Sequence, residues 1–142
     1  MKKAFTMLEL TFVIVVIGIL SAIAIPKFAA TRDDALVSRG KSTLAAVRNA
    51  IATERQKRIL RGDFTKITDL SADGGVFDKF SADKAGNKNA VLEYPPKSCT
   101  NPGCWSGSGT SYKFHAPSGG TDCTYTLSNN RLTTTSCALF GE

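Results

Sequence analysis

Apolar residues form one long, almost uninterrupted run near the start of the chain. From Leu10 to Ile25 sixteen residues carry no charge, and from Phe5 to Ile25 the only charged residue is Glu9. At about 1.5 Å per residue, a helix of this length spans roughly 30 Å, the thickness of the hydrocarbon core of a bilayer. Because the run is apolar on every face, it predicts a membrane-spanning helix or a helix buried on all sides.

A second pattern begins after Pro26, which is expected to end or kink the apolar run. Apolar residues now recur at spacings of three, four and seven, as on the buried face of an amphipathic helix: Leu36, Val37, Leu44, Val47 and Ile51. The apolar stripe becomes less regular after Ile51, because Arg58 falls on the same face of the helix. A cluster of cations followed by Gly62 then indicates the end of the helix. The pattern predicts one long helix over roughly residues 6–61, weakest at Pro26 and less so at Gly40.

The rest of the chain is rich in turn-forming residues and carries short segments of β-strand composition. The expected strands are 91–94, 112–115, 123–128 and 132–138. The last two would form a hairpin around Asn129-Asn130, since asparagine tolerates a positive φ. A two-residue turn pairs Leu127 with Leu132, whereas pairing Cys123 with Cys137 needs one extra residue, which a β-bulge would supply. The sequence therefore predicts an α+β fold, with the second half of the helix packed on a small antiparallel sheet.

Positive charge is concentrated on the predicted amphipathic helix. The chain has 142 residues and a net charge of +6, which taken alone suggests nucleic-acid binding. Residues 27–61 hold nine basic and three acidic side chains, whereas residues 62–142 hold seven basic and eight acidic ones. We interpret the charge mainly in terms of helix packing and orientation, with nucleic-acid contact as an alternative. The apolar run itself excludes a simple soluble cytosolic enzyme.

The start of the chain has some features of an ordinary secretory signal. Two lysines precede the apolar run, and the A-x-A sequence at residues 22–24 would supply a cleavage site. Glu9 argues against this interpretation, because an ionised carboxylate in an apolar segment is unfavourable unless it is paired. Cleavage after residue 24 would also discard the apolar part of a helix that continues beyond it, and would leave Pro26 at the second position.

The segment from Phe5 to Leu10, FTMLEL, follows a short Lys-Lys-Ala leader and opens the apolar helix. It resembles the prepilin signal of type IV pilins and type II secretion pseudopilins, and the likeness extends over residues 1–40. Gly18 and Pro26 stand where many members of that family have a helix-breaking Gly and Pro. The resemblance implies that residues 1–4 are a leader, although Ala4 replaces the usual Gly.

The resemblance also implies a life cycle. A prepilin peptidase would cut between Ala4 and Phe5 and N-methylate Phe5. Residues 5–26 would form a transmembrane and assembly helix in the lipid of the bacterial inner membrane. Residues 27–142, including amphipathic helix 27–61, would form a periplasmic pilin-like domain. An assembly platform with its ATPase would then draw the chain into a self-associated helical filament.

Several roles remain open for such a filament. It would extend as a type IV pilus, or act as a pseudopilus in type II secretion or in DNA uptake. The alternative from another class is a Sec-secreted or membrane-anchored binding domain that is stabilised by disulfides.

Glu9 is expected to direct assembly. After cleavage it lies in the first helical turn, where the helix dipole favours a carboxylate. In a dry helix bundle its natural partner is the amine of Phe5 on a neighbouring copy, since charges about 4 Å apart attract by about 4 kcal/mol at an effective dielectric constant of about 20. Gly18 and Ala22 form a small-xxx-small pair that would let helices approach closely, or occur by chance in a segment rich in small residues.

Four cysteines all follow residue 98: Cys99, Cys104, Cys123 and Cys137. Their even number in a small Gly-rich region indicates disulfides and an oxidising compartment. This favours a periplasmic C-terminal part, although the count of Lys and Arg on either side of the apolar run would reverse the topology. We favour the pairs Cys99–Cys104 and Cys123–Cys137, which close a short Pro-Gly loop and staple the predicted hairpin. A four-cysteine zinc site is the alternative, but only one pair has tight spacing.

Catalytic and metal-binding patterns are not evident in the sequence. His115 is the only histidine, and no Ser or Cys stands at a motif spacing from it, so a strand or surface role is the simpler interpretation. Four acidic residues recur without matching an EF-hand: Asp69, Asp73, Asp78 and Asp83. We therefore expect a structural protein with no catalytic residues, metal or cofactor.

Overall fold

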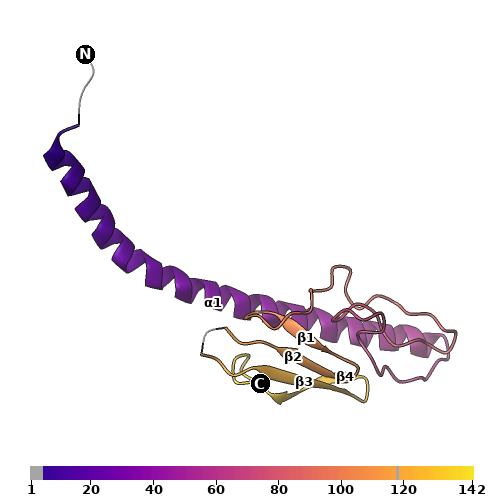
Figure 1. The fold of residues 1–142 in the computed structure, drawn as a ribbon. Helices are drawn as coiled ribbons and strands as arrows, with labels where there is room; N and C mark the ends of the chain where they lie inside the picture. The colour runs from indigo at the N-terminus through magenta and orange to yellow at the C-terminus, as the bar shows by residue number, and fades with distance from the viewer. Residues whose placement is uncertain (1–4, 118) are drawn as a thin grey trace. The chain divides into compact units, whose positions relative to one another are not determined.

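The structure, a computed structural model, describes residues 5–117 and 119–142. Within these residues it has one helix, α1 (Met7–Leu60), and four strands (Figure 1). The strands are β1 (Trp105–Ser108), β2 (Ser111–Phe114), β3 (Cys123–Ser128) and β4 (Arg131–Ser136). The predicted α+β class is confirmed. The chain divides into two compact units, Met1–Asp34 and Ala35–Glu142.

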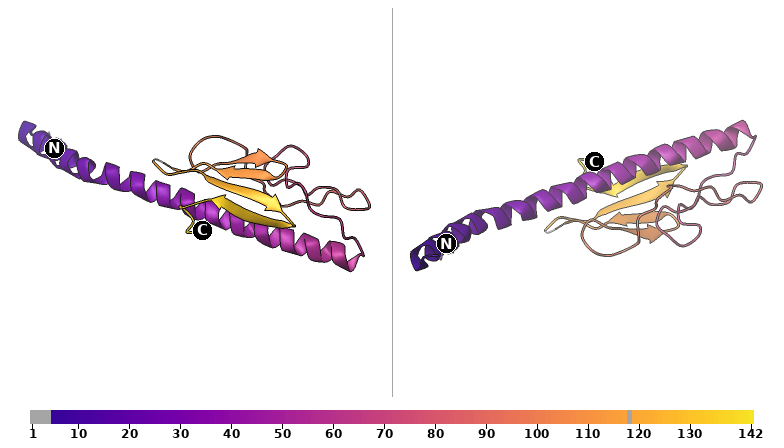
Figure 2. Two further views of the ribbon diagram at one scale, coloured as in Figure 1. Left: turned by 90° about the horizontal axis from the view of Figure 1, so that it is seen from below. Right: turned by 90° about the horizontal axis from the view of Figure 1, so that it is seen from above.

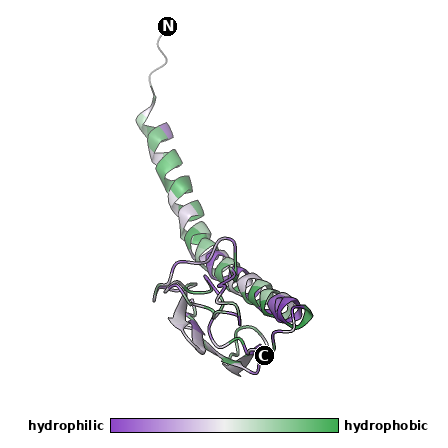
Figure 3. Cartoon of the chain, turned by 90° about the vertical axis from the view of Figure 1, so that its right-hand side faces the viewer, coloured by the Kyte–Doolittle hydropathy of each residue, from purple (hydrophilic) through white to green (hydrophobic). Residues whose placement is uncertain are grey.

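In the first unit α1 begins directly after Thr6. The Thr6 hydroxyl oxygen accepts a hydrogen bond from the backbone N–H of Glu9 at 3.2 Å, which satisfies one of the free N–H groups of the first turn. The helix does not end at Pro26, although proline cannot donate a hydrogen bond to the carbonyl four residues earlier. In Figure 3 most of this helical segment is green, the colour of hydrophobic residues.

In the second unit α1 packs on one face of the sheet (Figure 2). The buried stripe of the helix runs past the predicted residues to its end: Gly40, Leu44, Val47, Ile51, Glu54 and Arg58. The sheet is an antiparallel meander in the order β1-β2-β3-β4. Its inner face alternates with the strand pleat and carries large side chains: Trp105, Tyr112, Phe114, Tyr125, Leu127 and Leu132.

The β3–β4 hairpin has the predicted register. Leu127 pairs with Leu132 across a two-residue turn, and the register shifts at a bulge between Thr124 and Tyr125. Asn129 and Asn130 have φ angles of 50° and 60°, as a tight hairpin turn requires. The observed β3 coincides with the prediction, whereas β4 ends at Ser136 and β2 begins at Ser111.

Two predictions about the strands are wrong. Residues 91–94 form no strand; the nearest pairing is an isolated bridge between Lys79 and Ala90. Conversely, β1 was not predicted, because Trp-Ser-Gly-Ser has little strand character and is ordered by pairing with β2. The long connection 61–104 contributes to the core without strands, through Ile67, Leu70, Val76, Phe77, Phe80 and Val91.

Candidate functional site

The start of α1 presents an unpaired carboxylate. Glu9 lies in the first turn of the helix, and its side chain is exposed and makes no hydrogen bond or ion pair within the described residues. Phe5 precedes the helix and is 76% exposed. The predicted cleavage partner Ala4 lies outside the described residues. The sequence motif identified Glu9, but the cap from Thr6, which fixes where the helix begins, was not predicted.

The apolar part of α1 has no partner among the residues that the structure describes. The helix is long and apolar enough to cross a membrane, and its apolar segment is not buried by the rest of the described chain. A Cβ atom added at Gly18 would meet no atom within 4 Å, and Ala22 is exposed. Since water disfavours so much exposed apolar surface, this segment requires lipid or other protein chains around it.

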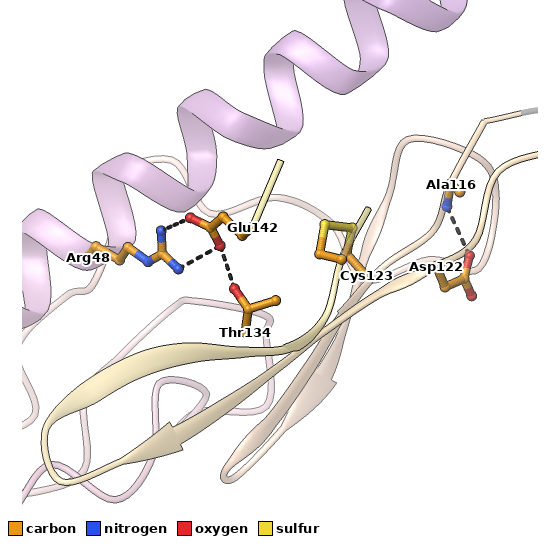
Figure 4. The surroundings of a disulfide bond; sticks show 7 residues. Arg48, Ala116, Asp122, Cys123, Thr134 and Glu142 are labelled. Carbon is orange, nitrogen blue, oxygen red and sulfur yellow. Dashed lines mark hydrogen bonds and ion pairs between the residues drawn. A yellow bond between two sulfur atoms is a disulfide. The ribbon is translucent and has the colours of Figure 1, made fainter. Parts of the chain in front are cut away.

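The cysteines form the two favoured disulfides, Cys99–Cys104 and Cys123–Cys137. Their Cα atoms are 5.6 and 4.4 Å apart, respectively. The second bridge joins the start of β3 to the residue after β4 (Figure 4). All four thiols are paired in these bridges, so none is free to act as a zinc ligand.

The Glu142 carboxylate bonds to side chains of both the helix and the sheet in the second unit. Both terminal nitrogens of Arg48 donate to the Glu142 carboxylate, which also accepts the Thr134 hydroxyl (Figure 4). The Nε of Arg48 donates to the Leu132 carbonyl at 3.2 Å. The Arg48 guanidinium lowers the pKa of Glu142 below its usual value, and Glu142 in turn raises the pKa of Arg48. These contacts join α1, β4 and the end of the chain.

A buried ion pair lies near the C-terminal end of α1, where the sequence pattern predicts that the apolar stripe becomes irregular. Arg58 is fully buried, and its Nε donates to Glu54 at 2.9 Å. Its Nη2 donates to the Ser81 carbonyl at 2.6 Å, while the Asn89 amide donates to Glu54 at 3.1 Å. The charged residues thus continue the buried stripe, because each finds a partner in the connection between α1 and β1.

His115 has partners that sequence spacing did not reveal. Its Nε2 lies 2.8 Å from Ser106 Oγ, and its Nδ1 lies 3.2 Å from Asp122 Oδ2. The other Asp122 oxygen accepts the Ala116 N–H at 2.9 Å, which is the main reason that the pKa of Asp122 lies below its usual value. The three side chains stand in the order Ser106–His115–Asp122, and the Lys113 ammonium also lies 3.8 Å from Asp122. Pairing of β1 with β2, absent from the prediction, brings them together.

Known proteins of type IV pili resemble this chain. It is 51% identical to the type IV narrow pilus major component PilA5 of Thermus thermophilus, over 40% of this chain and 51% of that protein. It is 32% identical to the type IV major fimbrial protein FimA of Dichelobacter nodosus, over 70% of this chain and 81% of that protein. The chain therefore spans about half the length of the first relative and most of the second. No family profile and no solved structure matches the chain.

The fold agrees with these relationships. A long N-terminal apolar helix, a four-stranded antiparallel sheet and two disulfides occur in one chain. The similarity to the fimbrial protein extends over most of both chains, well beyond the N-terminal motif. This chain belongs to the type IV pilin family.

Proposed function

We propose that this protein is a structural subunit of a type IV pilus, made as a precursor and built into the filament through its N-terminal helix. A prepilin peptidase removes residues 1–4 and methylates Phe5. The apolar helix then holds the subunit in the inner membrane with its disulfide-bonded part in the periplasm. An assembly platform and its ATPase transfer it into the filament, where helices of neighbouring copies replace lipid.

One observation carries this proposal: Glu9 is a carboxylate that pairs with none of the described residues, at the start of an apolar helix that those residues leave uncovered. In a helix bundle the amine of Phe5 on a neighbouring copy would neutralise that carboxylate. Burying either charge without the other is unfavourable. Neighbouring helices are therefore stable only in the register that brings Glu9 of one copy to the Phe5 amine of the next. The hydrocarbon core of the bilayer can surround the apolar segment before assembly but offers a carboxylate no such partner.

The named functions of the relatives favour a pilus over the other filament roles. Both relatives are described as major components of type IV pili or fimbriae. Secretion and DNA uptake stay as alternatives. Deleting the gene and measuring surface pili, secreted protein and transformation separates the three roles, because loss of pili with normal secretion is expected only for a pilus subunit.

The mature N-terminus tests the processing step. We expect mass spectrometry of the membrane-bound and filament-bound protein to find N-methylated Phe5 as the first residue. A mature chain that begins at Ile25 would instead identify a Sec-secreted domain, and an uncut chain in filaments would contradict the role of the peptidase.

Replacing Glu9 tests assembly. We expect Glu9→Gln to leave cleavage and membrane insertion intact but to lower the amount of protein in sheared filaments at least tenfold, because the neutral amide cannot pair with the Phe5 amine. Thr11→Ala is the matched control, since the Thr11 hydroxyl only donates to the Leu8 carbonyl of its own helix. Normal incorporation of the Glu9→Gln chain would overturn the pairing.

A further inference from the structure

The second unit exposes an aromatic side chain that its own fold does not use. Tyr94 is 85% exposed, more than any other aromatic residue of this unit. Its neighbour Glu93 is also exposed, and neither side chain makes a hydrogen bond or ion pair within the described residues. Pro95 and Pro96 follow, and their fixed φ angles stiffen the segment. A rigid, exposed Tyr beside a carboxylate has the composition of a contact point.

A complementary hollow lies between α1 and the β3–β4 hairpin. It has a volume of about 500 Å³ and an apolar floor that includes Ile51 and Leu132. Three arginines, Arg48, Arg55 and Arg131, line it, and no carboxylate does. We call it the arginine pocket.

The arginine pocket keeps uncompensated positive charge. Arg48 is paired with Glu142, and Arg55 donates one N–H to the Thr65 carbonyl at 3.0 Å. Arg131 is exposed and has no ion pair with any described residue. An aromatic ring with an adjacent carboxylate matches this environment, because guanidinium groups bind carboxylates in a fork and stack on aromatic faces.

Tyr94 and the arginine pocket lie on opposite sides of the buried stripe of α1. Tyr94 shares a hollow with Arg39 and Thr43, whereas Arg48 and Arg55 line the arginine pocket. At 3.6 residues per turn these pairs project to either side of the stripe through Leu44 and Val47. A tyrosine on one side cannot fill a pocket on the other side of the same unit, but it can fill that of another copy.

We propose that Glu93 and Tyr94 of one subunit dock into the arginine pocket of a second copy of this chain. The Tyr94 ring covers the apolar floor, and the Glu93 carboxylate pairs with Arg131. Because the two surfaces differ, the contact is head-to-tail and propagates into an open filament rather than closing a dimer. The two surfaces also lie at different levels of α1, since helix residues 39–43 line the hollow beside Tyr94 and residues 48–55 line the arginine pocket.

This inference rests on the proposed filament, and charge exchange in the full-length protein tests it. We expect Tyr94→Ala, Glu93→Arg and Arg131→Glu each to lower the yield of sheared filaments at least fivefold relative to the mature membrane pool. Combining Glu93→Arg with Arg131→Glu should raise the yield at least threefold over either single variant. Lys84→Glu is the matched control, since it changes the charge equally at an exposed lysine whose side chain lies outside both surfaces.

A crosslink tests the contact directly. A photoreactive benzophenone amino acid at position 94 keeps an aromatic side chain there. In filaments of mixed isotope-labelled and unlabelled subunits we expect it to join peptides containing residues 129–133 or 48–55 of a different copy. Unchanged fluorescence of Trp105 in the membrane pool verifies that the variants fold.

The outcomes separate this contact from the filament itself. If wild-type filaments do not contain this chain, the proposed function fails. If they do, and all variants assemble normally with position 94 crosslinked elsewhere, only the contact is overturned. Normal yield of Arg131→Glu filaments that have lost bound DNA would assign the arginine pocket to a polyanion and also overturn the contact.

Discussion

Gly40 illustrates how a single residue sets the distance between helix and sheet. A Cβ atom at this position would lie 2.6 Å from Cε2 of Phe114 and 2.9 Å from Cζ of Phe140. The sequence suggested a weak point in the helix, because glycine is a poor helix former. In the structure the helix is continuous there, and the absent side chain makes room for two aromatic rings.

We therefore expect Gly40→Ala to destabilise the second unit despite the higher helix propensity of alanine. The propensity gain is at most about 1 kcal/mol, whereas overpacking a core costs about 1–3 kcal/mol. Trp105 is the only tryptophan and is buried, so its fluorescence during thermal unfolding in detergent reports on this unit. Gly18→Ala, which has open space around it, should leave the transition unchanged. Equal stability of both variants would contradict the packing role of Gly40.

At the scale of elements, the helix and the last hairpin could be predicted, and the connection between them could not. The helix shows its apolar period over many turns, and the β3–β4 register follows from the Asn129-Asn130 turn and the need to bring Cys123 to Cys137. By contrast, β1 has no strand pattern of its own. The buried Arg58 depends on Ser81, and its helix neighbour Glu54 depends on Asn89. No local pattern connects Ser81 or Asn89, which lie far along the chain, to the helix.

The Glu54–Arg58 pair gives a prediction for the contact between α1 and the connection. We expect Arg58→Met to lower the free energy of unfolding by about 3–5 kcal/mol, because it leaves Glu54 buried without its counter-ion. Adding Glu54→Met should recover much of this loss, since both desolvated charges are then gone. Chemical denaturation followed by Trp105 fluorescence measures the three proteins. A double variant that is less stable than Arg58→Met would contradict this account.

At the scale of the whole molecule, the surface proposed for subunit contact is formed by residues that are far apart in the sequence. The N-terminal motif pointed directly to Phe5 and Glu9, because a lone carboxylate in an apolar run is visible in sequence. The arginine pocket was not visible in the sequence, since it combines helix residues with Arg131 at the start of β4. The same holds for the anchoring of Glu142 by Arg48.

The carboxylates of the second unit predict how the molecule responds to acid. Several have a pKa below its usual value: Asp63, Asp73, Asp83, Asp122 and Glu142. The backbone N–H groups of Lys84 and Thr65 hold the pKa of Asp63 at about 2, compared with an ordinary value of 3.8. A lowered pKa in the folded state stabilises the fold above the unfolded-state value, and this contribution is lost as the pH falls toward the folded-state value.

We therefore expect the thermal transition of the detergent-solubilised protein to fall steadily between about pH 4 and pH 2. Asp63→Asn should show a shallower fall, because it removes a carboxylate whose pKa is lowered to about 2 in the folded state. Glu93→Gln serves as the control, since the Glu93 side chain is exposed and makes no contact that folding would strengthen. An Asp63→Asn protein with the wild-type slope would show that other carboxylates dominate.

The disulfides also determine how the folded unit can lengthen under load. Cys123–Cys137 and Cys99–Cys104 close chain segments with sequence separations of 14 and 5 residues. An extended chain gains about 3.5 Å per residue, so these bridges remove roughly 50 Å and 17 Å from the length available to a pulled subunit. Even if tension separated β3 from β4, the hairpin would stay a closed loop. The unit is thereby limited in extension by covalent bonds, where an unbridged hairpin would depend on hydrogen bonds alone.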